Sequence, residues 1–153
     1  MSTPGLDIDL GDASQDGVYF VAESDPATSM FDTLASAAGA RGFAVARIDL
    51  GECRNKASAL TRMAGALALP ADFGHNWDAL SDCLRDLSWL KSDGYVLLIE
   101  RSAELRQARP RDFNTLLDIL DDSATSWLQA GTPFFVFLHL ADDADGLAAD
   151  EGG

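Results

Sequence analysis

The chain has 153 residues, of which 47% are hydrophobic, and it carries a formal net charge of −14 at pH 7. This length suits one domain with a buried core and is too short for two comfortable ones. The longest apolar run, Pro133 to Leu140, is far shorter than the roughly 20 residues that span a bilayer. Asp7 and Asp9 lie where an export signal has a basic region followed by an apolar one. We therefore expect a cytoplasmic protein without a membrane segment.

Most of the net charge lies in the two ends of the chain. Residues 1–16 and 142–153 together contain nine acidic residues and no basic one, whereas residues 17–141 have a net charge of only −5. Both ends are also poor in large apolar residues, which is typical of disordered flanks. We therefore predict one folded domain over residues 17–141 between two disordered acidic flanks. The negative charge also argues against direct binding to nucleic acid.

The apolar pattern predicts strands and helices in alternation. Two runs, residues 95–99 and 134–138, are too unbroken for a sheet with one face in water and indicate buried parallel strands. The helical spacing between these runs indicates a right-handed β-α-β crossover. We expect an α/β fold, a small parallel sheet covered by helices. The expected elements are a strand at 17–23, a helix capped by Asp25 that Gly39 and Gly42 end, a strand at 43–50, a loop at 51–55, a helix that Pro70 ends, a helix from Asn76, a strand at 95–99, a long helix that Gly131 ends and a strand at 134–138.

The helix after Asn76 is expected to have one apolar side and one acidic side. Apolar residues at helical spacing mark the buried side and turn an acidic face, Asp78, Asp82 and Asp86, toward solvent. The apolar stripe consists of Trp77, Leu80, Leu84 and Leu87. Asn76 is a plausible N-cap, and an acid at Asp78 suits the positive end of the helix. Asp82 lies one turn later, where this local explanation fails and carboxylates four residues apart repel each other.

Other side chains are expected to be structural. Cys53 and Cys83 lack the spacing of a metal or redox motif. We predict that Cys53 is a loop thiol, that Cys83 is a small core residue and that no disulfide joins them. His139 ends a strand, where a structural role is expected. Residues 101–111 contain four arginines without interleaved aromatic residues, which favours a loop that balances nearby carboxylates over a nucleic-acid site.

A specific motif surrounds the acidic face. A Leu-Pro pair is followed by an aromatic-Gly pair, an Asn, and then Asp-Ala-Leu and Asp-Cys-Leu. The residues are Leu69, Pro70, Phe73, Gly74, Asn76, Asp78, Ala79, Leu80, Asp82, Cys83 and Leu84. In order and spacing this motif resembles the barstar family of intracellular ribonuclease inhibitors. The resemblance covers roughly residues 44–140, so the strand and helix expected over residues 17–40 are an additional N-terminal β-α unit.

The resemblance implies a function without catalysis. Asp78 and Asp82 match the two acids with which the family occupies the basic active site of its ribonuclease, in place of RNA phosphates. Carboxylates on a rigid helix can bind arginine and lysine there through charge-assisted hydrogen bonds. A 1:1 complex with a basic ribonuclease, or a related basic enzyme, is expected, with no cofactor, no metal and no membrane or nucleic-acid partner. The partner-binding residues implied are Asp72, Phe73, Gly74, His75, Asn76, Trp77, Asp78, Ser81 and Asp82.

Two alternatives stay open. The family has a tyrosine where this chain has Asp72 and a tryptophan where it has Ser81, and such aromatic residues often supply much of the binding energy. The second hypothesis is therefore a protein interaction module of the same fold that does not inhibit a nuclease. The third is a metal-dependent enzyme in which His75, Asp78 and Asp82, at i, i+3 and i+7, are ligands.

Overall fold

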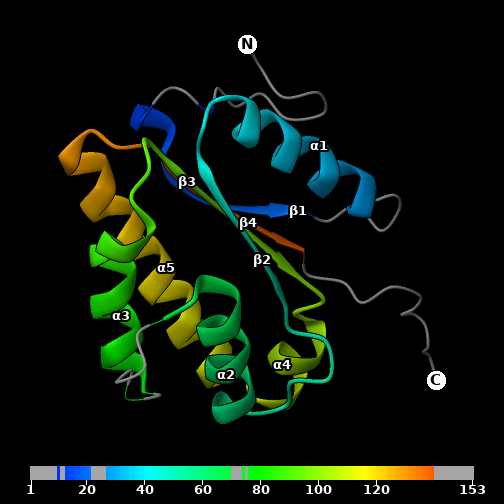
Figure 1. Ribbon diagram of the computed structural model, residues 1–153. Helices are drawn as coiled ribbons and strands as arrows, with labels where there is room; N and C mark the ends of the chain where they lie inside the picture. Colours follow the sequence, from blue (N-terminus) through cyan, green and yellow to red (C-terminus); the bar gives the residue numbers. More distant parts are fainter. Residues whose placement is uncertain (1–9, 11–12, 22–26, 70–73, 75, 140–153) are drawn as a thin grey trace.

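The computed structural model describes residues 10, 13–21, 27–69, 74 and 76–139. Its elements follow one another as an α/β chain (Figure 1), and the strands and long helices lie where the apolar pattern predicts them. In order, they are the 3-10 helix η1 (Ala13–Gln15), β1 (Gly17–Val21), α1 (Ala27–Ala40), β2 (Ala44–Asp49), α2 (Lys56–Leu67), α3 (Trp77–Asp86), the 3-10 helix η2 (Ser88–Leu90), β3 (Tyr95–Glu100), α4 (Ala103–Ala108), α5 (Pro110–Ala130) and β4 (Phe134–His139).

The four strands form one parallel sheet in the order β1-β4-β3-β2. β3 and β4 are central, and their side chains are buried with the exception of Glu100 at the end of β3. Parallel sheets need cover on both faces, which explains why these two strands are unbroken apolar runs. The expected small parallel sheet with helices on it is confirmed.

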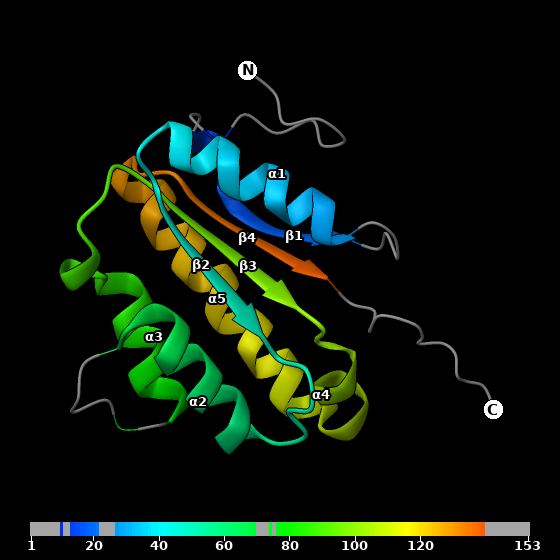
Figure 2. The same cartoon turned by 45° about the vertical axis from the view of Figure 1, so that its right-hand side comes forward.

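Helices cover the two faces of the sheet unequally. α2, α3 and α5 pack on one face, where alternate residues such as Leu97, Ile99 and Val136 join the larger core. α1 packs on the other face, against the intervening residues Val96 and Phe135. Figure 2 shows α1 on one side of the sheet and the other long helices on the opposite side. The period of two along each strand therefore assigns its residues to two separate hydrophobic clusters.

The additional N-terminal unit completes the sheet. β1 pairs along the outer edge of β4, with Gly17 in register with Phe135 and Val21 with His139. The Tyr19 ring stacks on that of Phe137, with the ring centroids 5.6 Å apart. This unit therefore supplies both a fourth strand and the helix that covers the second face.

Two local expectations were wrong. Gly39 lies inside α1, which continues to Ala40, and the following turn instead uses Gly42 with φ at +78°. Residues 101–111 include α4 and the start of α5 rather than one loop, because Ala103 and Leu105 bury their side chains. Cys53 lies in the loop between β2 and α2, as predicted, with its side chain buried, and neither Cys53 nor Cys83 is in a disulfide. The Asp25 cap and Pro70 lie outside the described residues.

Candidate functional site

α3 begins at a side-chain cap. Asn76 has extended backbone angles, and its Oδ1 accepts a hydrogen bond of 2.7 Å from the Ala79 backbone N–H. This bond satisfies one of the N–H groups that the first turn of a helix leaves unpaired. The Asn76 amide Nδ2 also donates to the Gly74 carbonyl oxygen at 3.4 Å. The predicted N-cap is confirmed, and it fixes where the helix starts and which side chains the first turn presents.

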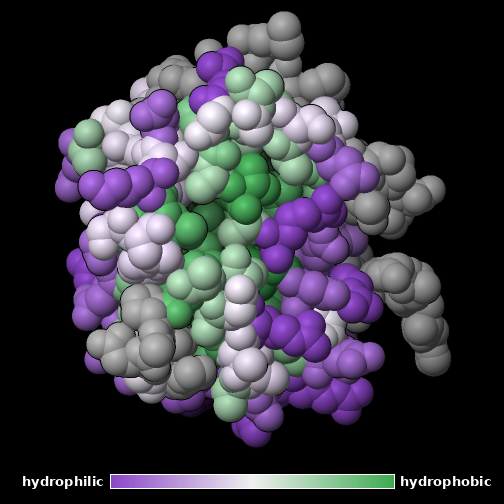
Figure 3. Space-filling view, in the orientation of Figure 1, coloured by the Kyte–Doolittle hydropathy of each residue, from purple (hydrophilic) through white to green (hydrophobic). Residues whose placement is uncertain are grey.

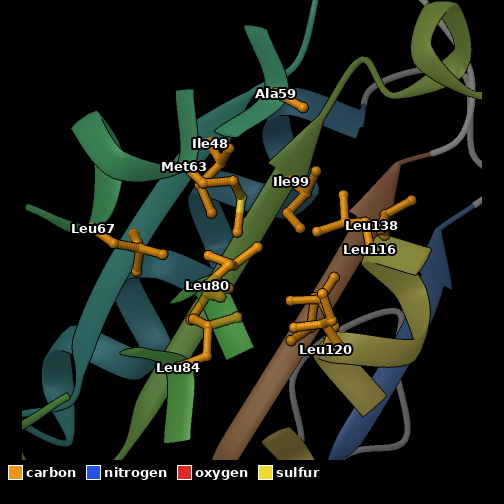
Figure 4. Close-up of a cluster of buried hydrophobic side chains, with 14 of the residues drawn as sticks. Ile48, Ala59, Met63, Leu67, Leu80, Leu84, Ile99, Leu116, Leu120 and Leu138 are labelled. Carbon is orange, nitrogen blue, oxygen red and sulfur yellow. The ribbon is translucent and has the colours of Figure 1, made fainter. Parts of the chain in front are cut away.

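The apolar side of α3 anchors the helix to the core. Leu80 and Leu84 are fully buried, as is Leu87 at the helix end, whereas Trp77 is only half-buried against the same core. Figure 4 shows Leu80 and Leu84 reaching toward Met63 and Leu67 of α2. Burying a leucine of this kind contributes about 1.5–3 kcal/mol. The orientation of α3 is therefore set by the core.

The opposite side of α3 presents carboxylates to solvent. Asp78, Asp82 and Asp86 are exposed, and the Asp82 side chain retains 77% of its accessible surface. Asp78 lies in the first turn, where the helix dipole favours an acid. Asp78 and Asp82 are four residues apart and are therefore neighbours on the helix surface. Helix geometry thus places two exposed carboxylates side by side on a rigid support.

Arg85 is a neighbour that the sequence reasoning did not include in the binding face. Its Nη2 donates to Asp82 Oδ1 at 2.9 Å, and its Nε donates to the Ser81 carbonyl oxygen at 3.3 Å. The Arg85 side chain is 47% exposed, so water screens this ion pair. The signal was present in the sequence, because a basic residue three positions after an acid on a helix lies beside it.

The predicted binding residues divide into two groups. Gly74 and the N-cap Asn76 precede α3, Trp77 begins it, and Asp78, Ser81 and Asp82 lie within its first two turns. The remaining three, Asp72, Phe73 and His75, lie outside the described residues. In the described ranges, no group of three His, Cys, Asp or Glu side chains is placed to hold a metal ion. The metal hypothesis depends on His75, which those ranges do not contain.

A second set of charged side chains lies at the carboxyl end of the sheet, where ion pairs join neighbouring elements of the fold. Arg101 donates to both carboxylate oxygens of Asp49, at 3.0 and 2.7 Å, and joins the ends of β2 and β3. These hydrogen bonds lower the pKa of Asp49 below its ordinary value, against the opposing effect of desolvation. Arg54 likewise binds Glu104 at 2.6 Å and lowers the pKa of that carboxyl group. Two of the arginines near this end thus balance carboxylates.

His139 has the structural position expected of it. It is the last residue of β4 and is 6% exposed. Its carbonyl oxygen accepts a hydrogen bond of 2.9 Å from the Ser102 hydroxyl group. This bond joins the end of β4 to the start of α4.

Comparisons with known proteins place this arrangement in a family. Residues 43–139 match the family model described as "Barstar (barnase inhibitor)", which covers more than half of the chain and includes the whole of α3. The matched region runs from β2 to β4 and leaves out β1 and α1. No curated protein matches the chain. In the part of the chain that the structure describes, no helix has the length and apolar character needed to cross a membrane.

Proposed function

The chain belongs to the barstar family, and on this premise we propose that it is an inhibitor protein that binds and blocks the basic active site of a ribonuclease. The observation that carries the proposal is the pair of exposed carboxylates, Asp78 and Asp82, on a helix fixed by its core and its cap. The proposed partner-binding residues are Asp72, Phe73, Gly74, His75, Asn76, Trp77, Asp78, Ser81 and Asp82.

The chemistry of the target supports this function. A ribonuclease must hold the phosphates of RNA with arginine, lysine or histidine, so its active site is a concave cationic surface. Two carboxylates on adjacent turns offer four oxygen acceptors to such a surface, and hydrogen bonds between charged groups are about twice as strong as neutral ones. Because α3 is already ordered, little entropy is lost in positioning the acids. The inhibitor then needs neither a cofactor nor a catalytic group.

The net charge of the chain supports rapid association with such a partner. The formal charge is −14, and residues 17–141 retain −5. Opposite net charges speed the diffusional encounter of two proteins, and this acceleration falls as salt is added. We therefore expect the association rate to fall with ionic strength more steeply than the dissociation rate changes.

The direct test compares two aspartates of α3. Asp82→Ala and Asp86→Ala remove the same charge from the same helix, but only Asp82 belongs to the proposed binding face. Calorimetry with barnase, and with ribonucleases purified from the source organism, measures the affinity of each variant. We expect Asp82→Ala to weaken a 1:1 complex by about 2–5 kcal/mol and Asp86→Ala by less than about 1 kcal/mol. The range expected for Asp82→Ala rests in part on charge pairs measured in the barnase–barstar complex itself.

Two results would contradict the proposal. Equal affinities for the two variants would show that the Asp82 carboxylate is not in the interface. Absence of binding, together with failure to protect RNA from the ribonucleases of the source organism, would exclude the inhibitor function.

A second candidate is a non-inhibitory interaction module of the same fold. Asp72 and Ser81 replace two aromatic residues of the family's binding face, and the β1-α1 unit lies outside the matched region. Aromatic residues commonly supply the largest contributions to binding. This candidate predicts that proteins captured from the native cell are not nucleases but are still lost with Asp82→Ala.

A further inference from the structure

Three exposed arginines lie where α4 meets α5. Arg106 is in the last turn of α4, Arg109 lies between the two helices and Arg111 is in the first turn of α5. Within the part of the chain that the structure describes, none of the three binds a carboxylate. The arginines that do so are Arg47, Arg54, Arg85 and Arg101. The arginine corner, defined as Arg106, Arg109 and Arg111, therefore keeps its positive charge available to a binding partner.

Few carboxylates oppose the arginine corner locally. Residues 101–112 contain four arginines and two acidic residues, Glu104 and Asp112, so their net charge is +2 in a chain of −14. Glu104 is already bound to Arg54, and the Glu52 backbone N–H also donates to it. These groups lie toward the start of α4, away from the junction with α5. The corner is therefore a basic area on an acidic molecule.

A hollow opens at the same corner. It measures about 370 Å³, and its walls are Ala108, Arg109, Pro110, Arg111 and Asp112. Asp112 is half-buried in the first turn of α5, where the helix dipole favours an acid. Figure 3 shows hydrophilic surface over the region where α4 lies in Figure 1. A carboxylate that enters the hollow lies beside two arginines, with which it can form charge-assisted hydrogen bonds.

The acidic C-terminal segment, residues 142–151, is attached close to this corner. His139 ends β4, and its carbonyl oxygen accepts a hydrogen bond of 2.9 Å from the hydroxyl group of Ser102, which precedes α4. Because a helix rises about 1.5 Å per residue, Arg109 lies within about 10 Å of Ser102. An extended chain spans about 3.3–3.6 Å per residue, so residues 140–142 are enough to cover this distance. The acids of the segment are Asp142, Asp143, Asp145, Asp150 and Glu151.

The acidic N-terminal flank is placed less well for the same contact. Leu10 is buried in the cluster beneath α1, whereas Leu105 of α4 belongs to the cluster on the opposite face of the sheet. Gly17 begins β1 at the amino end of the sheet, and α4 follows the carboxyl end of β3. A tethered segment also meets its site at an effective concentration on the order of millimolar, which favours it over a separate acidic protein. The C-terminal segment is therefore the favoured occupant.

We propose that residues 142–151 bind the arginine corner of their own chain. The carboxylates of the segment pair with the three arginines and keep external polyanions such as RNA away from this basic surface. The contact is electrostatic, so added salt weakens it. No residue of α3 takes part, and the proposal therefore does not depend on ribonuclease inhibition.

The first test neutralises the segment in the full chain. The variant combines Asp142→Asn, Asp143→Asn and Asp145→Asn. The matched control removes the same charge from the other end and combines Asp7→Asn, Asp9→Asn and Asp12→Asn. We expect the side-chain Nε–H signals of the arginine corner, measured by NMR at low salt, to shift in the variant and not in the control. Equal shifts in the two proteins, or no shift in either, would overturn the proposal.

The second test measures binding of a single-stranded oligouridylate at low salt. We expect the neutralised segment to raise the affinity of the chain for this RNA by about tenfold, and the control, which has the same net charge, to raise it much less. Adding Arg109→Gln and Arg111→Gln to the variant should remove the gain, whereas adding Lys56→Gln and Lys91→Gln should not. Equal RNA affinities for variant and control would show that only net charge matters. RNA binding as tight in the unaltered chain would show that the corner is open. Either result would overturn the proposal.

Discussion

The indole nitrogen of Trp127 in α5 donates a hydrogen bond of 2.8 Å to the carbonyl oxygen of Leu84 in α3. The Trp127 ring also stacks on Phe134 of β4 and contacts Tyr95 of β3. One side chain thus joins the sheet, the long helix and the last turn of the helix that carries the acidic face. The residue that holds α3 in place therefore lies 43 positions away from its bond partner in the sequence.

Trp127→Phe should destabilise the domain by about 1–2 kcal/mol. The variant keeps a ring near Phe134 but leaves the half-buried carbonyl oxygen of Leu84 without its donor. Urea denaturation followed by circular dichroism measures the change in free energy of unfolding. Leu128→Ala is the control, because the adjacent Leu128 side chain is 40% exposed. It should lower the free energy of unfolding by less than Trp127→Phe does. Equal losses would show that the indole hydrogen bond contributes little.

Asn76→Ala should cost both stability and partner affinity. Loss of an N-cap side chain costs about 1 kcal/mol and loosens the first turn, where Asp78 lies. Asn55→Ala is a closely matched control, because the Asn55 Oδ1 caps α2 in the same way, with a bond of 2.9 Å from Ser58 N–H. We expect similar losses of unfolding free energy in the two variants but weaker ribonuclease binding only in Asn76→Ala. A binding loss in both would show that general destabilisation is the cause.

Arg85→Ala should leave stability almost unchanged and speed association with a basic partner. The ion pair of Arg85 with Asp82 is exposed, so its removal should change the unfolding free energy by less than about 1 kcal/mol. Without Arg85, the carboxylate has no competing cation and the face has one positive charge fewer. Stopped-flow association with the ribonuclease tests this, with Arg85→Lys as the charge-preserving control. Slower association of Arg85→Ala would indicate that Arg85 itself contacts the partner.

Asp49 should make stability depend on pH in the acidic range. Arg101 lowers the pKa of Asp49 in the folded state, so the folded protein binds this proton less readily than the unfolded chain. The stabilisation is complete above the ordinary aspartate pKa of about 3.9 and is lost as the pH falls through the lower folded value. Asp49→Asn should therefore be less stable at neutral pH and lose less stability on acidification. Denaturation curves at a series of pH values provide the measurement, and parallel curves for the two proteins would contradict the expectation.

Much of the fold could be predicted because hydrophobic periodicity is a local property of the sequence. The unbroken runs in β3 and β4 indicated strands buried on both faces, and the Asn76 cap and the apolar stripe of α3 indicated which carboxylates face solvent. The errors had a different origin. Gly39 was expected to end a helix that runs one residue further, to Ala40, and the following turn uses Gly42. The buried side chains of Ala103 and Leu105 stabilise a short helix that a charge-rich pattern did not predict.

The candidate site divides in the same way. Helix spacing alone placed Asp78 and Asp82 side by side, whereas the role of Arg85 depended on the direction of its side chain. Part of the predicted N-terminal flank is ordered, because η1 lies at residues 13–15 and Asp16 Oδ1 accepts a hydrogen bond of 2.8 Å from the Phe134 backbone N–H. The division of the chain at residues 16 and 142 stays a prediction, as does the assignment of Asp72, Phe73 and His75 to the binding face.

By itself, the sequence determined the α/β class, the start of α3 and the acidic character of its outer side, because capping and helical spacing act within a few residues. Only the tertiary structure decided that the Trp127 indole in α5 donates a hydrogen bond to the Leu84 carbonyl oxygen in α3. It also decided that β1 and α1 cover the edge of β4 and the second face of the sheet. These features join residues that are far apart in the chain, and their positions depend on packing that no local pattern specifies.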